Sequence, residues 1–234
     1  MAVLEGPHLV GEALAARIRL TEVLATPEFL TTAEAAALAP RFPRPPLAVE
    51  RSVLAALADA DAPQGLLAIA DLPRSGVESL PLRADGIYVL AEGLQDPGNV
   101  GALARTCEAA GAAGLALAAG SAHPNHPRAM RASAGSLLRL PVAVQADLDA
   151  LDRRLRTLSP RRLALVPRGG TPWGDVETGG AIVLLLGAEG PGLSRELVER
   201  ADLRVTIPLA HPVESLNATV AAAVVLFEIA RRRR

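Results

Sequence analysis

The apolar run at residues 181–186 is the clearest strand signal in the chain. Every position in it is apolar, which is typical of a strand covered on both faces in the middle of a parallel sheet. The run stops at Gly187, and the loop that follows contains two further glycines before Ser194, the predicted cap of a helix over 195–201. In open α/β sheets a ligand binds at such a carboxyl end, although a tight turn that uses glycine only for its dihedral angles is the alternative.

Five other segments have the composition of strands and alternate with helical stretches. These predicted strands cover 87–91, 115–119, 142–144, 163–166 and 204–207. The alternation predicts a parallel sheet wrapped by helices. The last helix is predicted over 216–234, with Val220, Val224 and Phe227 on one side and four arginines at its end, where cations complement the helix C-terminus.

The first 70 residues predict a small α/β unit of their own. Helices are expected to begin at Gly6-Pro7, after Thr32 and near Ser52. Between them, strands are expected at 2–4, 22–25, 47–49 and 65–70. The stretch 71–82 is the best candidate for a linker, because proline, serine and glycine gather there. We therefore predict two domains, 1–76 and 84–234, joined by a linker at 77–83.

The composition describes a folded protein with few aromatic side chains. Half of the residues are hydrophobic but only 2% are aromatic, so stacking on aromatic rings is not a main binding mode. The single cysteine, Cys107, excludes an internal disulfide, and neither a signal peptide nor a membrane-spanning run is recognisable. These observations predict a cytoplasmic protein without a membrane partner.

Charge is distributed unevenly, although the net value is only -1. Residues 1–82 carry six arginines against ten carboxylates, a net charge of -4, whereas residues 83–234 carry eighteen against fifteen, a net charge of +3. Nucleic-acid-binding proteins are more typically basic throughout. This balance counts modestly against an RNA partner.

A second strand–loop–helix segment begins after the strand at 87–91. Its glycines fit neither a Walker loop, because Asn99-Val100 stands where Lys-Ser/Thr is required, nor the dinucleotide fingerprint, because they are spaced G-x4-G-x2-G. ATP hydrolysis and nucleotide-dependent oxidoreduction are therefore disfavoured. What is left is a helix expected to be capped near Asn99 and closed by Gly111, with Arg105 two turns along it.

A third segment, 207–217, again joins a strand to a helix through an irregular loop. It contributes Ser215 and Asn217, which alone would be ordinary residues of a helix start. The carboxyl ends of parallel strands meet at one edge of a sheet. Five polar residues from the three segments are therefore expected at one mouth: Asn99, Arg105, Glu189, Ser215 and Asn217.

Together the three segments resemble the three motifs of the SpoU/TrmH family of RNA ribose 2′-O-methyltransferases, in the SPOUT superfamily. The matching residues are Asn99-x-Gly-x3-Arg105, Leu186-Gly-Ala-Glu-Gly-x-Gly-Leu193 and Ile207-Pro-Leu-x4-Glu-Ser-Leu-Asn217, in the family's order and spacing. The resemblance implies an α/β fold with a parallel-sheet methyltransferase domain and a C-terminal trefoil knot. It also implies S-adenosylmethionine as the cofactor, no metal, and a homodimer.

The same resemblance implies roles for individual residues. The backbone that would hold the cofactor lies around Leu186, Gly187, Gly192, Ile207 and Leu216. Asn99, Ser215 and Asn217 would order the knot and the hydroxyl through hydrogen bonds, while Glu189 would orient Arg105 or backbone N–H groups. Arg105 would lie at the acceptor, where it anchors a flanking phosphate or takes the proton. The phosphate role is favoured, because a free guanidine is too basic to be neutral at pH 7.

Two other patterns are interpreted as structural. His123-Pro-Asn-His126 has the spacing of metal ligands, but it lies in a proline-containing loop with no carboxylate or thiol nearby in sequence, so no metal site is predicted. Cys107 is close to Arg105 in the same predicted helix and is expected to pack in the core.

The N-terminal unit resembles the family's small substrate-recognition domain, which is similar to a ribosomal RNA-binding protein. The likeness rests on Leu4-Glu-Gly-Pro-His-Leu-Val-x-Glu-Ala-Leu14 and Pro63-Gln-Gly-Leu-Leu-Ala-Ile69. Relatives have a further helix before the strand that begins here at Ala2, so the domain is predicted to be N-terminally shortened. Its presence favours large-subunit (23S) ribosomal RNA over tRNA as the substrate. A tRNA 2′-O-methyltransferase and a catalytically silent RNA-binding relative are the alternatives.

Overall fold

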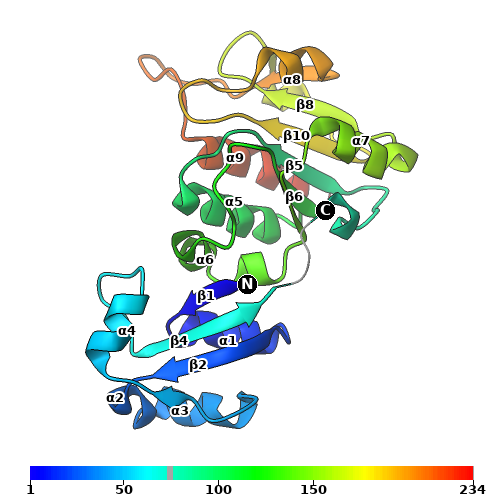
Figure 1. Cartoon of the computed structure of the whole chain (residues 1–234). Coiled ribbons are helices and arrows are strands. Elements are labelled where there is room, and N and C mark those ends of the chain that lie inside the picture. The colour runs from blue at the N-terminus through cyan, green and yellow to red at the C-terminus, as the bar shows by residue number, and fades with distance from the viewer. Residues whose placement is uncertain (73–75, 234) are drawn as a thin grey trace.

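The computed structural model describes residues 1–72 and 76–233, which form two lobes around two separate sheets (Figure 1). The smaller lobe is N-terminal and is drawn in blue and cyan, and the larger lobe holds the rest of the chain. The lobes meet where helix α6 (Pro127–Ser133) lies against strand β1 (Ala2–Glu5). Within the described residues, no helix combines the length and the apolar character needed to cross a membrane.

A mixed four-stranded sheet with the order β1-β4-β2-β3 forms the smaller lobe. Strand β4 (Leu66–Asp71) is antiparallel to β1 and to β2 (Arg19–Ala25), and β2 is parallel to β3 (Leu47–Ala48). The helices of this lobe are α1 (Pro7–Ala15), α2 (Pro27–Leu30), α3 (Ala33–Leu38) and α4 (Arg51–Leu57), with a 3-10 turn η1 at Ala39–Arg41. The predicted order of elements is confirmed, apart from the unpredicted α2.

Two helix starts in this lobe test the local sequence signals. Thr32 caps α3 as predicted, because its Oγ1 accepts a hydrogen bond from the Ala35 N–H at 3.1 Å. The predicted start near Ser52 is correct to within one residue, but α4 begins at Arg51 and Glu50 occupies the capping position without a capping hydrogen bond from its side chain.

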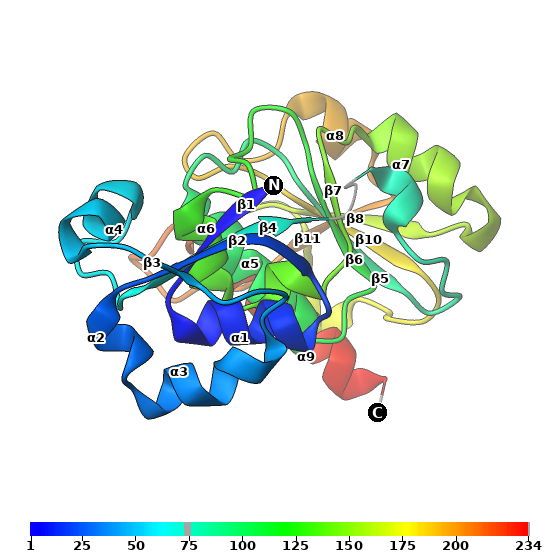
Figure 2. The ribbon, with the colours of Figure 1, turned by 60° about the horizontal axis from the view of Figure 1, so that its bottom comes forward.

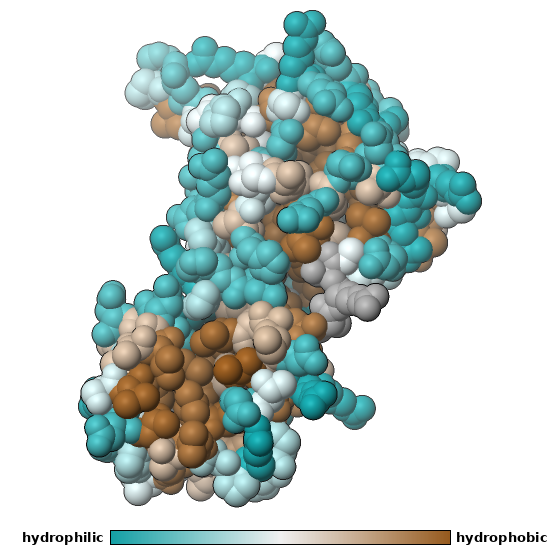
Figure 3. Space-filling model, in the orientation of Figure 1, coloured by the Kyte–Doolittle hydropathy of each residue, from teal (hydrophilic) through white to brown (hydrophobic). Residues whose placement is uncertain are grey.

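The two faces of the small sheet have different surroundings. One face is buried in the core through Leu4, Leu66 and Ala68, which pack with α1. On the opposite face Val3 lies across from Ile69, and both side chains are partly exposed. Figure 3 shows this second face as the broad apolar surface of the smaller lobe.

The connection between the lobes contains one described element, a 3-10 turn η2 at Val77–Ser79. The predicted linker stretch 71–82 includes residues 73–75, which lie outside the described residues. Beyond the turn, Leu80 is fully buried and its carbonyl accepts a hydrogen bond from Arg154 Nη2 at 2.6 Å. This part of the predicted linker is therefore anchored on the larger lobe.

The larger sheet has seven strands in the order β7-β6-β5-β10-β8-β11-β9, and every neighbouring pair is parallel. The strands are β5 (Ile87–Ala91), β6 (Gly114–Leu117), β7 (Val142–Val144), β8 (Arg161–Leu165), β9 (Thr171–Pro172), β10 (Ile182–Leu186) and β11 (Leu203–Thr206). The prediction of a central strand is confirmed, because β10 has three strands on each side and all five of its residues are buried. The two-residue β9 was not predicted.

Helices cover both faces of this sheet (Figure 2). Helices α7 (Leu148–Leu155) and α8 (Arg195–Arg200) pack on the face that contains Val183 and Leu185 of β10. The other face contains Leu184 and is covered by α5 (Pro97–Ala109) and α9 (Ala218–Arg232). Three 3-10 turns complete the lobe: η3 (Ser136–Leu138), η4 (Arg156–Leu158) and η5 (Trp173–Asp175).

Helices α5 and α9, which cover the same face of the larger sheet, each begin at a different residue from the one predicted. Helix α5 is capped by Asp96, whose Oδ1 accepts a hydrogen bond from the Gly98 N–H at 2.7 Å, so Asn99 lies inside the first turn instead of capping it. Helix α9 begins at Ala218, after Asn217 as the cap. Consequently Asn99 is held on a helix and Asn217 stands immediately before one.

Ion pairs from two arginines of the larger lobe hold the lobes together. Arg131 on α6 pairs with Glu5 and Asp59 of the smaller lobe, each at 2.6 Å. Arg139 pairs with Glu12 of the smaller lobe and, at 2.7 Å, with Glu108 of α5. These contacts tie the smaller lobe to α5 and α6.

Candidate active site

A cavity of about 370 Å³ opens at the carboxyl ends of β8, β10 and β11. All five residues predicted to surround a cofactor line it: Leu186, Gly187, Gly192, Ile207 and Leu216. The remaining wall is formed by Leu165, Val166, Pro167, Ala188, Glu189, Gly190, Leu209, Ser215, Asn217, Ala218 and Ala221. This volume is within the range of small-molecule sites, and most of the wall is apolar or bare backbone.

The glycine-rich loop after β10 is folded back on itself. A Cβ atom at Gly187 would lie 2.1 Å from the Gly192 carbonyl carbon and from the Leu193 nitrogen, so only glycine fits there. The Gly192 N–H donates to the Ala188 carbonyl at 3.0 Å, and Gly190 and Gly192 both have positive φ. The loop therefore presents main chain, with few side chains, to the cavity.

Glu92 holds the far end of this loop. Its Oε2 accepts a hydrogen bond from the Ser194 N–H at 2.7 Å, and its own N–H donates to the Leu186 carbonyl at 2.8 Å. Ser194 caps α8 as predicted, with its Oγ accepting from the Leu197 N–H at 3.4 Å. The role of Glu92 was not predicted, because nothing in its local sequence indicates a partner about a hundred residues away.

Three of the predicted polar residues meet at the rim of the cavity, and we call Asn99, Glu189 and Asn217 the site cluster. Asn99 Nδ2 donates to Glu189 Oε1 at 2.9 Å, and Asn217 Nδ2 donates to the same oxygen and to Asn99 Oδ1. The Asn217 Oδ1 caps α9 by accepting from the Thr219 and Val220 N–H groups at 2.9 and 3.2 Å. One residue from each of the three predicted segments is thus joined in a single hydrogen-bonded group.

The other two predicted polar residues lie apart from this cluster. Ser215 lines the cavity and is exposed. Arg105 is exposed on α5 and is not part of the cavity wall. Glu189 was expected to orient Arg105 or backbone N–H groups, whereas its hydrogen-bond donors among the described residues are the Asn99 and Asn217 amides.

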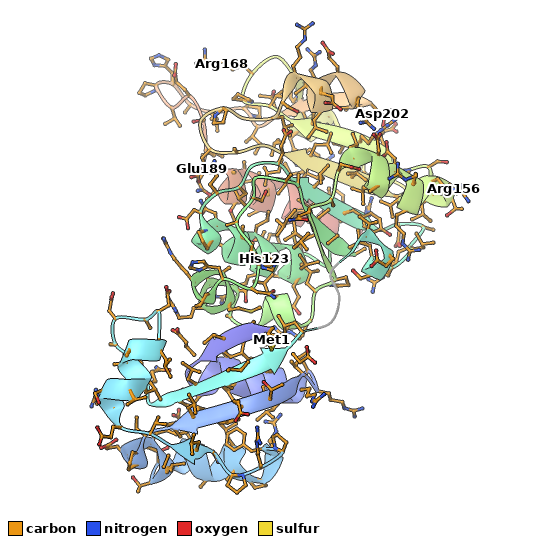
Figure 4. All side chains as sticks on the ribbon, in the orientation of Figure 1. Met1, His123, Arg156, Arg168, Glu189 and Asp202 are labelled. Carbon is orange, nitrogen blue, oxygen red and sulfur yellow. The ribbon has the colours of Figure 1, made fainter. Side chains whose placement is uncertain are left out.

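An ion pair joins two loops whose neighbouring residues, Pro167 and Ser215, line the cavity. Arg168, in the loop after β8, donates to Glu214 Oε1 at 2.7 Å, and Glu214 immediately precedes the wall residues Ser215 and Leu216. Figure 4 shows Arg168 at the same edge of the larger lobe as Glu189. Both partners are largely exposed, so the pair is a weak and openable contact between two loops. Arg168 was not predicted, because its partner lies far away in the sequence.

Cys107 packs in the core, as predicted. Cys107 is fully buried in α5, and burial raises the pKa of its thiol to about 12. His123 and His126 each accept a backbone hydrogen bond through Nδ1 at 3.1 Å, from the Asn125 and Arg128 N–H groups. Across the described residues, no three His, Cys, Asp or Glu side chains come together as a metal site requires.

Comparison with known proteins identifies the family. Residues 86–227 match the model of the SpoU rRNA methylase family, and residues 1–68 match that of the MRM3-like substrate binding domain. The first match covers more than half of the chain. The protein therefore belongs to the SpoU rRNA methylase family.

Individual relatives agree with this assignment. An uncharacterized tRNA/rRNA methyltransferase of Mycobacterium sp. (strain KMS) is 39% identical over 158 residues, which are 65% of this chain and 49% of the relative. The chain thus spans about half the length of the curated relatives that it matches.

Solved structures match over nearly the whole chain. The SpoU methyltransferase AviRb from Streptomyces viridochromogenes, in complex with AdoMet, is 26% identical with a TM-score of 0.88, and the match covers 99% of this chain and 89% of that one. A structure described as an RNA 2′-O ribose methyltransferase is 28% identical with a TM-score of 0.84, and the match covers 99% of this chain and 88% of that one. A structure concerned with 2′-OH methylation of C/U34 on tRNA, 27% identical with a TM-score of 0.57, covers 63% of this chain and 95% of its own. The predicted α/β fold class with a knotted parallel-sheet domain is confirmed by these matches.

Proposed function

We propose that this protein transfers a methyl group from S-adenosylmethionine to a ribose 2′-hydroxyl of RNA, most specifically of large-subunit ribosomal RNA. The observation that carries the proposal is the site cluster at the rim of the β10 cavity, where Asn99, Glu189 and Asn217 from three distant segments converge. Family membership and the AdoMet and RNA named for the matched structures support it.

The cavity suits the cofactor in size and chemistry. Apolar side chains such as Leu186 and Ile207 fit a purine ring, and the folded loop from Gly187 to Gly192 offers main chain to polar groups. When bound, S-adenosylmethionine supplies a methyl group on a sulfonium, which the ribose oxygen displaces in line as the hydroxyl proton leaves. No metal is required for this reaction.

The site cluster would position the acceptor hydroxyl. Glu189 Oε1 is occupied by the two amide donors, and no described residue donates to Oε2, so Oε2 is left to accept a hydrogen bond from the ribose. Ser215 adds a hydroxyl at the cavity wall. Arg105 is exposed on α5, which supports its role as a phosphate anchor, because a guanidinium acts as a base only where water is excluded.

The smaller lobe favours ribosomal RNA over tRNA. The match to the substrate binding domain falls in this lobe, whereas the matched structure that concerns tRNA covers only 63% of the chain. A tRNA 2′-O-methyltransferase is the second candidate. An RNA substrate also supports the expected cytoplasmic location.

Two further features belong to the proposal. The division into domains 1–76 and 84–234 with a linker at 77–83 is supported by the family matches at 1–68 and 86–227. A homodimer is supported by the exposed side of α9, where Val220, Val224 and Phe227 form an apolar stripe along one side of the helix.

Methyl transfer tests the reaction and the substrate together. The protein is incubated with labelled S-adenosylmethionine and either large-subunit ribosomal RNA or tRNA, and label in 2′-O-methylribose is measured after digestion. We expect label in ribosomal RNA only, and loss of at least about 100-fold in rate for Glu189→Gln. Label in tRNA alone would favour the second candidate. Cofactor binding without label in either RNA would favour the catalytically silent relative.

A further inference from the structure

A ridge of hydrogen-bond donors lies between the site cluster and the smaller lobe. It consists of His123, His126 and Arg128, in the loop before α6 and in its first turn, and we call it the α6 ridge. All three side chains are exposed. Figure 4 places His123 in the part of the larger lobe that is nearer the smaller lobe, and Figure 3 shows hydrophilic surface over α6, next to the apolar face of the smaller lobe.

Both histidines present an N–H group to solvent. Each accepts a backbone hydrogen bond through Nδ1, from the Asn125 N–H for His123 and from the Arg128 N–H for His126. In a neutral imidazole whose Nδ1 accepts, the proton is carried by Nε2. The local backbone therefore fixes two rings in the tautomer that offers a donor at the exposed nitrogen.

Arg128 extends the ridge to the site cluster. Its guanidinium lies beside the first turn of α5, with Nε 3.4 Å from the position of a Cβ on Gly98, the residue before Asn99. Its one ion pair among the described residues is a long one, 3.4 Å to Asp96 Oδ2, and its side chain is 59% exposed. The guanidinium thus keeps most of its donors available within one residue of the site cluster.

The other end of the ridge reaches the smaller lobe. The pKa of Asp59 in that lobe is lowered mainly by its hydrogen bond from Arg131, and to a lesser degree by the nearby positive charge of Arg128. Arg128 therefore lies within Coulombic reach of the smaller lobe. Asn125 also donates from Nδ2 to the Met1 carbonyl at 3.2 Å.

Charge balance indicates what the ridge binds. Residues 1–82 carry a net charge of -4, so the smaller lobe itself supplies little neutralisation for an RNA backbone. Donors without acceptors, together with the planar fork of an arginine, are suited to phosphate oxygens. A metal is a poor fit, since both Nδ1 atoms are occupied by backbone N–H groups.

We propose that the α6 ridge binds the phosphates of the RNA strand where it passes from the smaller lobe to the site cluster. This inference rests on the proposed RNA substrate. It accounts for RNA recognition by a protein whose N-terminal lobe is acidic, because the larger lobe beside it supplies the Arg128 cation and two N–H donors.

Substitutions that keep the local fold test the ridge. Asparagine at positions 123 and 126 keeps an acceptor near the place of Nδ1 and replaces the Nε2–H at the tip of the ring by a shorter amide. The ridge variant is therefore His123→Asn, His126→Asn and Arg128→Gln in the full chain. The matched control is Arg156→Gln, which removes one exposed arginine at the far edge of the larger lobe (Figure 4). Binding to large-subunit ribosomal RNA is measured by fluorescence anisotropy between low and high salt.

The expected result is a weakening of RNA binding by about tenfold or more. The slope of log affinity against log salt concentration should fall by about 0.7–0.9, the value for one phosphate, because Arg128 is the one cation removed. The KM for RNA rises while kcat at saturating RNA and the affinity for S-adenosylmethionine stay unchanged. The control retains wild-type binding and slope. Unchanged RNA affinity and slope in the ridge variant would overturn the inference, whatever the methylation result.

The two proposals fail in different ways. A wild-type protein that binds the RNA through the ridge but transfers no methyl group contradicts the proposed reaction and supports the ridge. A wild-type protein that methylates RNA with no effect of the ridge variant on KM supports the reaction and contradicts the ridge. Absence of any RNA binding by the wild type contradicts both.

Discussion

Both ends of the Asn217 side-chain amide form hydrogen bonds. One end stabilises helix α9, and the other end belongs to the candidate active site. Its Oδ1 accepts from the Thr219 and Val220 N–H groups and so caps α9. Its Nδ2 donates to Glu189 and Asn99 within the site cluster. A variant that keeps the oxygen but loses the N–H donors isolates the second use.

Asn217→Asp is expected to retain the helix cap and to lose activity. The new carboxylate faces Glu189, so the site cluster loses two hydrogen bonds and gains charge repulsion, and methyl transfer should fall by roughly 10- to 100-fold. Asn217→Ala loses the cap as well, which costs about 1 kcal/mol of stability. Thermal unfolding and kcat of both variants are measured. Wild-type turnover in Asn217→Asp would show that the cluster does not act on the reaction.

Gly187 is restricted by packing and not by its dihedral angles. A methyl group there meets the backbone of Gly192 and Leu193 at 2.1 Å, so the loop must open. Because overpacking costs about 1–3 kcal/mol, we expect Gly187→Ala to raise the dissociation constant for S-adenosylmethionine by roughly 10- to 100-fold.

Calorimetric titration of the cofactor checks this expectation. The matched control is Gly179→Ala, where an added Cβ has open space and φ is not positive. The control should bind as the wild type does. Equal affinity in Gly187→Ala and the control would mean that the folded loop is not part of the cofactor site.

At the level of elements, helix α9 has an apolar outer side that no other part of the described chain covers. The helix packs on the core through Ala222, Val225 and Ile229, yet Val224 and Phe227 on its other side are 43% and 49% exposed. A predicted apolar stripe normally faces the core. Here the stripe is left for another surface, which a second copy of the chain would cover.

Val224→Asp with Phe227→Asp is expected to convert the proposed homodimer into a monomer. Burying two carboxylates in an apolar interface costs several kcal/mol, and association is measured by sedimentation at several protein concentrations. The matched control, Val53→Asp with Leu57→Asp, changes two similarly exposed apolar residues on α4. Dissociation by the control pair and not by the α9 pair would assign the interface to the smaller lobe instead.

Elements with a strong local pattern could be predicted from the sequence. The central strand β10 is apolar at every position and was predicted to within one residue of its bounds. Strand β9 has only two residues, Thr171 and Pro172, and carries no pattern. The start of α5 was predicted too late, because Asp96 and Asn99 are both good capping residues and only the fold selects between them.

The candidate site was predictable where glycines and polar residues mark a motif, and not where a partner is distant. All five predicted cofactor residues line the cavity. Glu92 and Arg168, by contrast, act through Ser194 and Glu214, which meet them only after folding. No local pattern indicates such pairs.

On the scale of the whole molecule, charged contacts set how the lobes sit against each other. The pKa of Glu108 is held below its ordinary value, first by its hydrogen bond from Arg139, which also pairs with Glu12 of the smaller lobe. The pKa of Asp59 is likewise lowered by Arg131. If the ridge guides RNA between the lobes, these pairs keep its two ends aligned.

The stability that these ion pairs contribute at the contact between the lobes, here called the joint, should therefore fall as the pH falls. In the unfolded chain the two carboxyls return to ordinary pKa values of about 4. A group whose folded pKa is depressed stabilises the fold above its unfolded pKa, and the contribution is lost as the pH falls through the folded pKa. We expect Glu108→Gln to be less stable than the wild type at pH 7, by about 0.2–1 kcal/mol, and the difference to shrink as the pH falls below about 4.

Thermal unfolding of wild type and variant across this pH range measures the difference. Glu196→Gln serves as a control, because its ion pair with Arg200 lies within α8, at 3.5 Å and away from the joint. The control should match the wild type at every pH. A deficit of Glu108→Gln that is the same at pH 3 as at pH 7 would mean that the carboxylate stabilises the protein through packing and not through charge, and the lobes would then be held together by their shared apolar core.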